Sequence, residues 1–90
     1  MSKILIIDDE AQIRSLLARM MELEGYEVCQ AGDCKSALKQ LELHSPDVAL
    51  CDVFLPDGNG VDLVLPIKKT APNVELSLIH ISEPTRRVVI

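Results

Sequence analysis

Aromatic residues are almost absent from this chain of 90 residues, which has one tyrosine, one phenylalanine and no tryptophan. Modules that bind single-stranded nucleic acid stack bases on aromatic side chains, so this class of protein is disfavoured. Positive charge is also scarce, since 9 Lys and Arg residues stand against 14 Asp and Glu residues, for a net charge of −5. DNA-binding surfaces are normally basic, and we therefore expect no direct nucleic-acid binding by this segment.

Long apolar runs and paired cysteines are missing as well. No run approaches the roughly 20 apolar residues of a membrane-spanning helix, and the first run, residues 4–7, is too short for a signal peptide. The cysteines Cys29, Cys34 and Cys51 are odd in number and lack CxxC spacing, so we expect reduced, mostly buried thiols. The sequence therefore predicts a cytoplasmic protein with no membrane segment.

The chain does contain short apolar runs that alternate with segments of helical periodicity. Runs at residues 4–7, 26–31 and 47–51 predict strands, and Val74 opens a fourth. Helical patterns fill the intervals between these strands. Such alternation with short connections predicts an α/β fold: a flavodoxin-like, doubly wound parallel sheet, incomplete, with about four strands and three helices.

Local signals refine this outline. Gly25 can take the left-handed conformation that ends a helix, and Asp33 is a candidate N-cap for the second helix. Pro66 lies inside the third predicted helix, residues 61–70, and should kink it. The first helix should bury one stripe of side chains, namely Ile13, Leu16, Leu17, Met20 and Met21.

Acidic residues stand where two of the predicted strands end. Asp8 and Asp9 follow the first strand, and Asp52 follows the third. In the flavodoxin-like order these strands are neighbours, and ligands bind at their carboxyl ends. We therefore expect three carboxylates to meet, where they repel one another unless a cation neutralises them. Any one acid alone has a structural alternative, as a charge at a helix start or as a loop residue.

This arrangement suits one kind of chemistry. Mg²⁺ takes one or two carboxylates together with water and phosphate oxygens. A divalent ion in the pocket could screen an incoming phosphoryl group and orient it for in-line attack by a carboxylate oxygen. The product would be an acyl phosphate on an aspartate.

Three segments resemble the successive signatures of response-regulator receiver domains: KILIIDDE at 3–10, PDVALCD at 46–52 and LPDGNGVDL at 55–63. The resemblance runs from Lys3 to about Glu75. It implies that Asp52 accepts a phosphoryl group from a sensor histidine kinase of a two-component system. It also implies that the first helix, with Ile13 and Leu17, is the kinase-docking face, for which ordinary core packing is the alternative.

The resemblance implies a metal site as well. Mg²⁺ would be the cofactor, with Asp9 and Asp52 as ligands and Asp8 acting mostly through water. The backbone carbonyl of Phe54 would supply a further ligand. The loop beside the site would be shaped by Pro56 and Gly60.

The final segment departs from the family. Receiver domains have five strands and five helices, with a Ser or Thr ending the fourth strand and a Lys ending the fifth. Here the hydroxyl position falls near His80, and no lysine follows Lys69. Residues 76–86, LSLIHISEPTR, resemble a translated transposase-type sequencing adapter. We therefore expect a partial receiver domain at 1–75 and a non-native tail at 76–90; the rival interpretation is a divergent fourth strand at 74–81.

Truncation would expose apolar surface and a strand edge, so we expect poor folding. We also expect little phosphorylation-driven switching, because the missing hydroxyl and lysine are the groups that contact the phosphoryl oxygens in the family. Two other functions remain open. One is a Mg²⁺-dependent phosphohydrolase with an aspartyl nucleophile, as in the haloacid dehalogenase type. Those enzymes usually carry a second Asp two residues later, where this chain has Phe54. The other is a passive interaction module. We expect a phosphoacceptor rather than an enzyme.

Overall fold

The computed structural model describes residues 2–52, 54–55 and 58–79. Four parallel strands form one sheet in the order β2 (Glu27–Ala31), β1 (Lys3–Ile7), β3 (Val48–Asp52) and β6 (Glu75–Ile79). This order matches the first part of the predicted flavodoxin-like arrangement, which confirms the fold class. The helices of the described residues are α1 (Ala11–Leu23), α2 (Cys34–His44) and α3 (Val64–Thr70).

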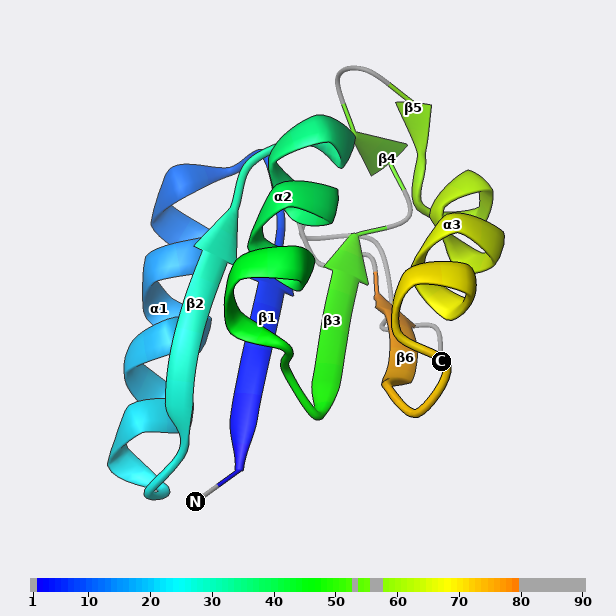
Figure 1. The fold of residues 1–90 in the computed structure, drawn as a ribbon. Coiled ribbons are helices and arrows are strands. Elements are labelled where there is room, and N and C mark those ends of the chain that lie inside the picture. Colours follow the sequence, from blue (N-terminus) through cyan, green and yellow to red (C-terminus); the bar gives the residue numbers. More distant parts are fainter. Residues whose placement is uncertain (1, 53, 56–57, 80–90) are drawn as a thin grey trace.

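A small hairpin lies beyond the carboxyl ends of β1 and β3 (Figure 1). Its antiparallel strands are β4 (Phe54–Leu55) and β5 (Gly58–Asn59), and a 3₁₀ turn, Gly60–Leu63, leads from it into α3. The hairpin follows β3 almost directly along the chain. It therefore forms one wall of the region where the acidic residues stand.

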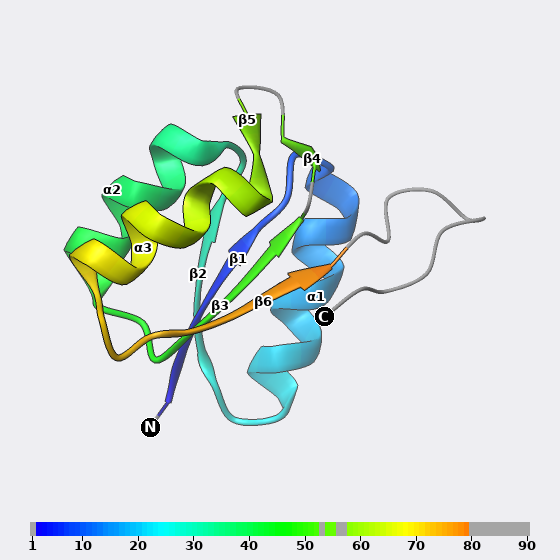
Figure 2. The same ribbon diagram turned by 90° about the vertical axis from the view of Figure 1, so that its right-hand side faces the viewer.

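Helices cover the two faces of the sheet unequally. Figure 2 shows α2 and α3 together on one face and α1 on the other. Strand β1 is buried on both faces: Leu5 and Ile7 belong to the core beneath α2 and α3, whereas Ile4 and Ile6 pack with Ala18 of α1. A strand covered on both faces needs apolar side chains at every position, which explains the unbroken run of residues 4–7.

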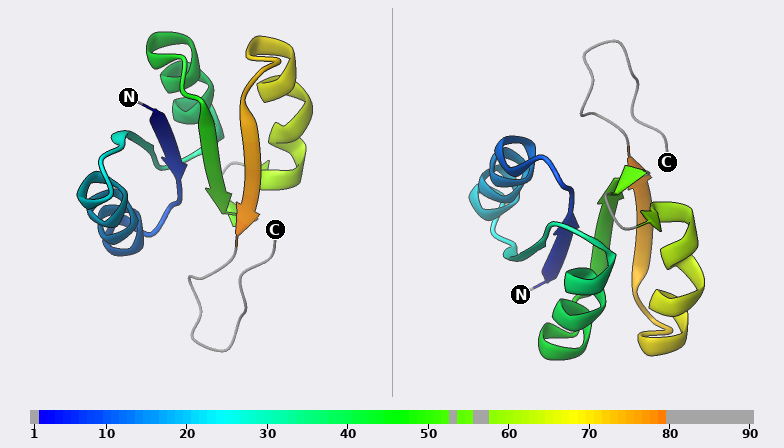
Figure 3. Two further views of the ribbon diagram at one scale, coloured as in Figure 1. Left: turned by 90° about the horizontal axis from the view of Figure 1, so that it is seen from below. Right: turned by 90° about the horizontal axis from the view of Figure 1, so that it is seen from above.

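The buried stripe predicted for α1 is only partly right. Leu17 and Met21 pack against the core, but Leu16 and Met20 are 59% and 48% exposed. The physical reason is the place of α1, which contacts β1 and β2 and lies away from β6 (Figure 3). Only one edge of its apolar stripe therefore reaches the sheet. Whether a chain with this exposed surface folds cooperatively stays a prediction.

Both predicted helix-end signals are confirmed. Gly25, just after α1, has a φ of 95°, which glycine adopts without the strain that a side chain brings. The side chain of Asp33 accepts a hydrogen bond of 2.7 Å from the backbone N–H of Ser36 and so caps α2. These two residues set where the first two helices end and begin.

The predicted kink at Pro66 is wrong, because Pro66 does not lie in the interior of an α-helix. The segment opens as a 3₁₀ turn, and the α-helix begins only at Val64, so Pro66 lies in the first turn of α3. Backbone N–H groups in a first turn have no partner within the helix, so the donor that proline lacks is not missed there.

Strand β6 includes residues assigned above to a non-native tail. Its Leu76 and Leu78 lie opposite Ala49 and Cys51 of β3 and pack toward the core beneath α2 and α3. A fourth strand therefore forms at Glu75–Ile79, and the assignment of these residues to a non-native tail stays a prediction. Alternating leucines suit such a position whatever their coding origin. His80 and the rest of the tail lie outside the described residues.

The helices carry one further finding. Within the described part of the chain, no helix combines the length and apolarity needed to cross a bilayer.

Candidate functional site

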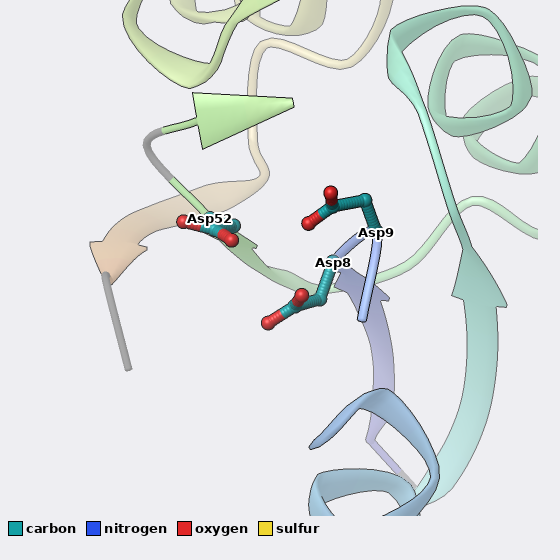
Figure 4. A group of neighbouring side chains, drawn as sticks. All are labelled: Asp8, Asp9 and Asp52. Carbon is teal, nitrogen blue, oxygen red and sulfur yellow. The ribbon is translucent and has the colours of Figure 1, made fainter. Parts of the chain in front are cut away.

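Two neighbouring strands bring the three predicted acids together. Ile7 of β1 lies opposite Cys51 of β3, so the next residues, Asp8 and Asp52, stand level at the carboxyl edge of the sheet. Asp9 follows on the loop into α1, and all three side chains converge (Figure 4). One carboxylate oxygen from each residue lies within 4.8 Å of the others. Asp52 thus lies beside two residues that precede it in the sequence by 43 positions or more.

The three carboxylates differ sharply in burial. Asp8 and Asp52 are fully buried, whereas Asp9 is exposed. Burial is the main reason why the pKa of Asp8 is raised to about 6. A backbone hydrogen bond from Glu10 opposes this rise, and the negative charges of Asp52, Asp9 and Glu10 add to it. The site therefore holds negative charge at an energetic cost near neutral pH.

The two carboxylate oxygens of Asp8 have different environments. Oδ1 accepts a hydrogen bond of 2.9 Å from the N–H of Glu10, just before the first residue of α1. The structural alternative is therefore partly realised, because Asp8 does satisfy a backbone donor at the start of a helix. Oδ2 is buried and accepts no hydrogen bond from the described residues. An oxygen in that state needs a proton or a cation, so helix capping alone does not account for Asp8.

A hard divalent cation fits this donor set. The group offers oxygen atoms only, from three carboxylates close enough to share one ion. A cation would satisfy Oδ2 of Asp8 and remove the mutual repulsion of the three charges. The exposed position of Asp9 leaves one side open to water and to an incoming phosphoryl group.

The other predicted site residues are less closely defined. Phe54 opens β4, two positions beyond Asp52, and the role of its carbonyl as a ligand stays a prediction. Gly60 opens the 3₁₀ turn before α3, and Pro56 lies outside the described residues. Their loop-shaping roles also stay predictions.

The residues of the predicted docking face lie on α1. Leu17 is half-buried and packs against the core of Ile4, Ile6 and Ala18, as the packing alternative expects. Ile13 is also half-buried. A docking role for this face stays a proposal.

Cys29, Cys34 and Cys51 form no disulfide in the structure, and of the three only Cys51 is fully buried, where mostly buried thiols were predicted. Burial, with the neighbouring Cys34, Asp52 and Asp8 adding to it, raises the pKa of the Cys51 thiol to about 12. The thiol therefore stays protonated at neutral pH, and its Sγ donates to the carbonyl of Asp52 at 3.2 Å. It is a neutral neighbour of the acidic cluster.

One contact beside the cluster escaped the sequence interpretation. Arg14 of α1 reaches back over the start of its helix, and its Nη1 donates to the backbone carbonyl of Asp8 at 2.7 Å. In the sequence, an arginine six residues after an aspartate looks like any other residue on the surface of a helix. No pattern in a single sequence distinguishes it.

Comparison with known proteins gives a consistent family. Residues 4–88 match the family described as response regulator receiver domain. Among curated proteins, the transcriptional regulatory protein PdtaR of Mycobacterium tuberculosis is 44% identical over 78 residues, which are 83% of this chain and 38% of that protein. The chain spans only 30% to 38% of the length of the first curated relatives that it matches.

Solved structures agree in fold. A CheY-like response regulator receiver domain protein from Methanospirillum hungatei superposes with a TM-score of 0.86 at 29% identity, covering 94% of this chain and 68% of that one. A response regulator protein from Burkholderia pseudomallei, with a phosphorylated aspartic acid, calcium ion and citrate, has a TM-score of 0.85 at 28% identity. That match covers 89% of this chain and 47% of the other.

Proposed function

Because this chain belongs to the response regulator receiver domain family, we propose that Asp52 accepts a phosphoryl group from a sensor histidine kinase, with Mg²⁺ held at the acidic cluster. The observation that carries the proposal is the convergence of Asp8, Asp9 and Asp52 within 4.8 Å at the carboxyl ends of β1 and β3. Carboxylates at this edge of a doubly wound sheet lie where such folds bind their ligands.

Asp52 is the nucleophile of the proposed transfer. One of its carboxylate oxygens attacks phosphorus while the bond from phosphorus to the histidine nitrogen of the donor breaks. The electron pair of that bond remains on the imidazole, which takes up a proton, and Asp52 becomes an acyl phosphate. The chemistry that Mg²⁺ supplies when bound is neutralisation of the charge on the phosphoryl oxygens.

Asp8 and Asp9 are the proposed holders of the cation. Asp9 is exposed and can take the ion directly, whereas the buried Asp8 has one oxygen engaged with Glu10 and the other available. The Burkholderia pseudomallei response regulator structure contains a phosphorylated aspartic acid and a calcium ion, which supports the proposal that this chain takes a phosphoryl group and a hard divalent cation. We favour Mg²⁺ because it is usually bound through one or two carboxylates and keeps several waters, and the exposed Asp9 lies where water can reach the ion.

The alternative, a phosphohydrolase, has less support. It needs an acid or base two residues after its nucleophile, and Phe54 provides neither. We therefore propose a phosphoacceptor rather than an enzyme, acting in the cytoplasm, with an acyl phosphate that persists instead of turning over. The family's hydroxyl position falls on His80, which has no hydroxyl group to donate to a phosphoryl oxygen, so we propose that phosphorylation drives little switching in this chain.

Incubation with acetyl phosphate and Mg²⁺, followed by intact-mass spectrometry, tests this function. We expect the mass of the wild type to increase by one phosphoryl group. The increase should not occur when EDTA is present from the start, nor in Asp52→Asn. Asp62→Asn is the matched control, because it removes an exposed carboxylate outside the cluster and should leave the gain unchanged. Continuous release of phosphate would instead favour the hydrolase. A wild type that is folded by circular dichroism but gains no mass would overturn the proposal.

A further inference from the structure

The side chain of Arg14 makes two hydrogen bonds that the proposed function does not explain. Its Nη1 donates to the carbonyl of Asp8 at 2.7 Å, and its Nε donates to the side-chain Oε1 of Gln30 at 3.3 Å. Gln30 belongs to β2, so the guanidinium links α1 to the edge strand and to the end of β1 at once. Two donors in a planar fork fix the orientation of the group better than a single contact does.

The carbonyl that Arg14 holds belongs to the peptide between two acids of the cluster. A peptide unit is rigid and planar, so the direction of the Asp8 carbonyl also sets the direction in which the chain enters Asp9. Asp8 is restrained at two other points: its N–H donates to the carbonyl of Ala31 at 3.0 Å, and its Oδ1 accepts from Glu10. Without Arg14, the peptide plane between the two carboxylates would lose the one side-chain bond that the described structure gives it.

Among the described residues, no side-chain capping bond at the start of α1 replaces this restraint. The N-cap residue, Glu10, makes no side-chain capping hydrogen bond, and the first turn of the helix contains no acidic residue. The loop from β1 into α1 is therefore held mainly through backbone atoms and Asp8. Arg14 is half-buried, which reduces the competition of water for its bond to the carbonyl.

Gly32 lies directly beside the guanidinium of Arg14. A Cβ at position 32 would stand 3.1 Å from Nη1 of Arg14, closer than an ordinary carbon–nitrogen contact. The backbone of Gly32 does not have a positive φ, in contrast to that of Gly25. A side chain at position 32 would therefore displace the guanidinium by a few tenths of an ångström, whereas the backbone itself does not call for glycine.

We propose that Arg14 is a positioning residue for the carboxylate cluster, holding the Asp8–Asp9 peptide so that both carboxylates face one cation, and that a side chain at position 32 would disturb this contact. The cation-binding consequence rests on the proposed function above. Residues that orient metal ligands in this way typically contribute 10- to 100-fold to metal affinity. We expect Arg14→Ala to weaken Mg²⁺ binding by about tenfold.

Four variants of the full chain separate positioning from charge. Arg14→Ala removes the contact, and Arg14→Lys restores one donor without the fork, so it should recover part of the affinity. Gly32→Ala should weaken Mg²⁺ binding in the wild type but add nothing in the Arg14→Ala background, because both changes act through one contact. Arg19→Ala, an exposed arginine on the same helix, removes the same charge and should have no effect.

Two readouts are used: Mg²⁺ affinity by calorimetric titration, and hydrogen exchange of the Glu10 amide by NMR in metal-free protein. The proposal expects faster Glu10 exchange and weaker Mg²⁺ binding in Arg14→Ala, with the non-additive response to Gly32→Ala. Wild-type exchange and affinity in Arg14→Ala, or an equal loss in Arg19→Ala, would overturn it. If the wild type itself bound no Mg²⁺, the proposed function would fall, and Glu10 exchange would still decide for or against Arg14.

Discussion

The two ends of the parallel sheet carry opposite electrostatic arrangements. At the amino end, Lys3 lies among partners: its Nζ pairs with Glu27 at 3.2 Å and donates to the carbonyl of His44 at 2.9 Å. Its backbone N–H donates to Oδ2 of Asp47, also at 2.9 Å. Charges of both signs are present at this end, and the chain itself satisfies them.

At the carboxyl end, three charges of one sign converge and two of them are fully buried. The fold does not neutralise Asp8, whose raised pKa reflects burial and like-charged neighbours. The comparison teaches that one end of the sheet is complete as a folded structure, whereas the other is complete only with a proton or a cation. Function is expected where the chain leaves charge uncompensated.

The largest expected effect concerns the protonation of Asp8 in metal-free protein. Its pKa rises from 3.8 to about 6 on folding, so the folded state binds more protons than the unfolded state between these values. This contribution to stability, about 3 kcal/mol, is present below pH 3.8 and is lost as the pH rises through 6. Urea unfolding in EDTA across pH 4 to 7, roughly the window of the shift, measures it.

Asp8→Asn is the control for that measurement, because asparagine retains an oxygen for the Glu10 amide but does not ionise in this range. The difference in unfolding free energy between Asp8→Asn and the wild type should grow as the pH rises. A difference that is the same at every pH would mean that the carboxyl end holds its charge without cost, and the contrast between the two ends would fail.

A smaller effect is expected from the cation. Mg²⁺ at ten times its dissociation constant should stabilise the folded chain by about 1.4 kcal/mol, because it binds only the folded arrangement. Thermal unfolding with and without Mg²⁺ checks this. Asp9→Asn should remove most of the stabilisation, whereas Glu22→Gln, an exposed acid on α1, should keep it. Equal stabilisation of both variants would indicate general screening of charge instead of a site.

The smallest effect is expected at the amino end. The Lys3–Glu27 pair has side chains that are 28% and 61% exposed, so Glu27→Gln should lower stability by only about 0.5 kcal/mol. The loss should shrink in 1 M salt, where exposed charges are screened. Mg²⁺ affinity should not change. An effect on Mg²⁺ binding as large as that of Asp9→Asn would show that the two ends are coupled.

The sequence predicted the parts of this protein that depend on local pattern. Alternating apolar runs and helical periods were enough for the strand order, and the ends of two strands were enough for Asp8, Asp9 and Asp52. Leu16 and Met20 were wrongly predicted as buried. A helical period identifies an apolar stripe, but how wide a strip of sheet meets that stripe depends on which strands lie beneath the helix.

What the sequence alone determined was therefore a parallel sheet with three carboxylates at one edge, because periodicity and strand ends are properties of neighbouring residues. Only the tertiary structure decided that Asp8 is buried with one oxygen engaged, and that Arg14 passes over Gly32 to hold its carbonyl. Those contacts join β1, α1 and the loop after β2. Whether a side chain of one element reaches another depends on how the elements pack together, and the residue spacing within a single element does not determine this.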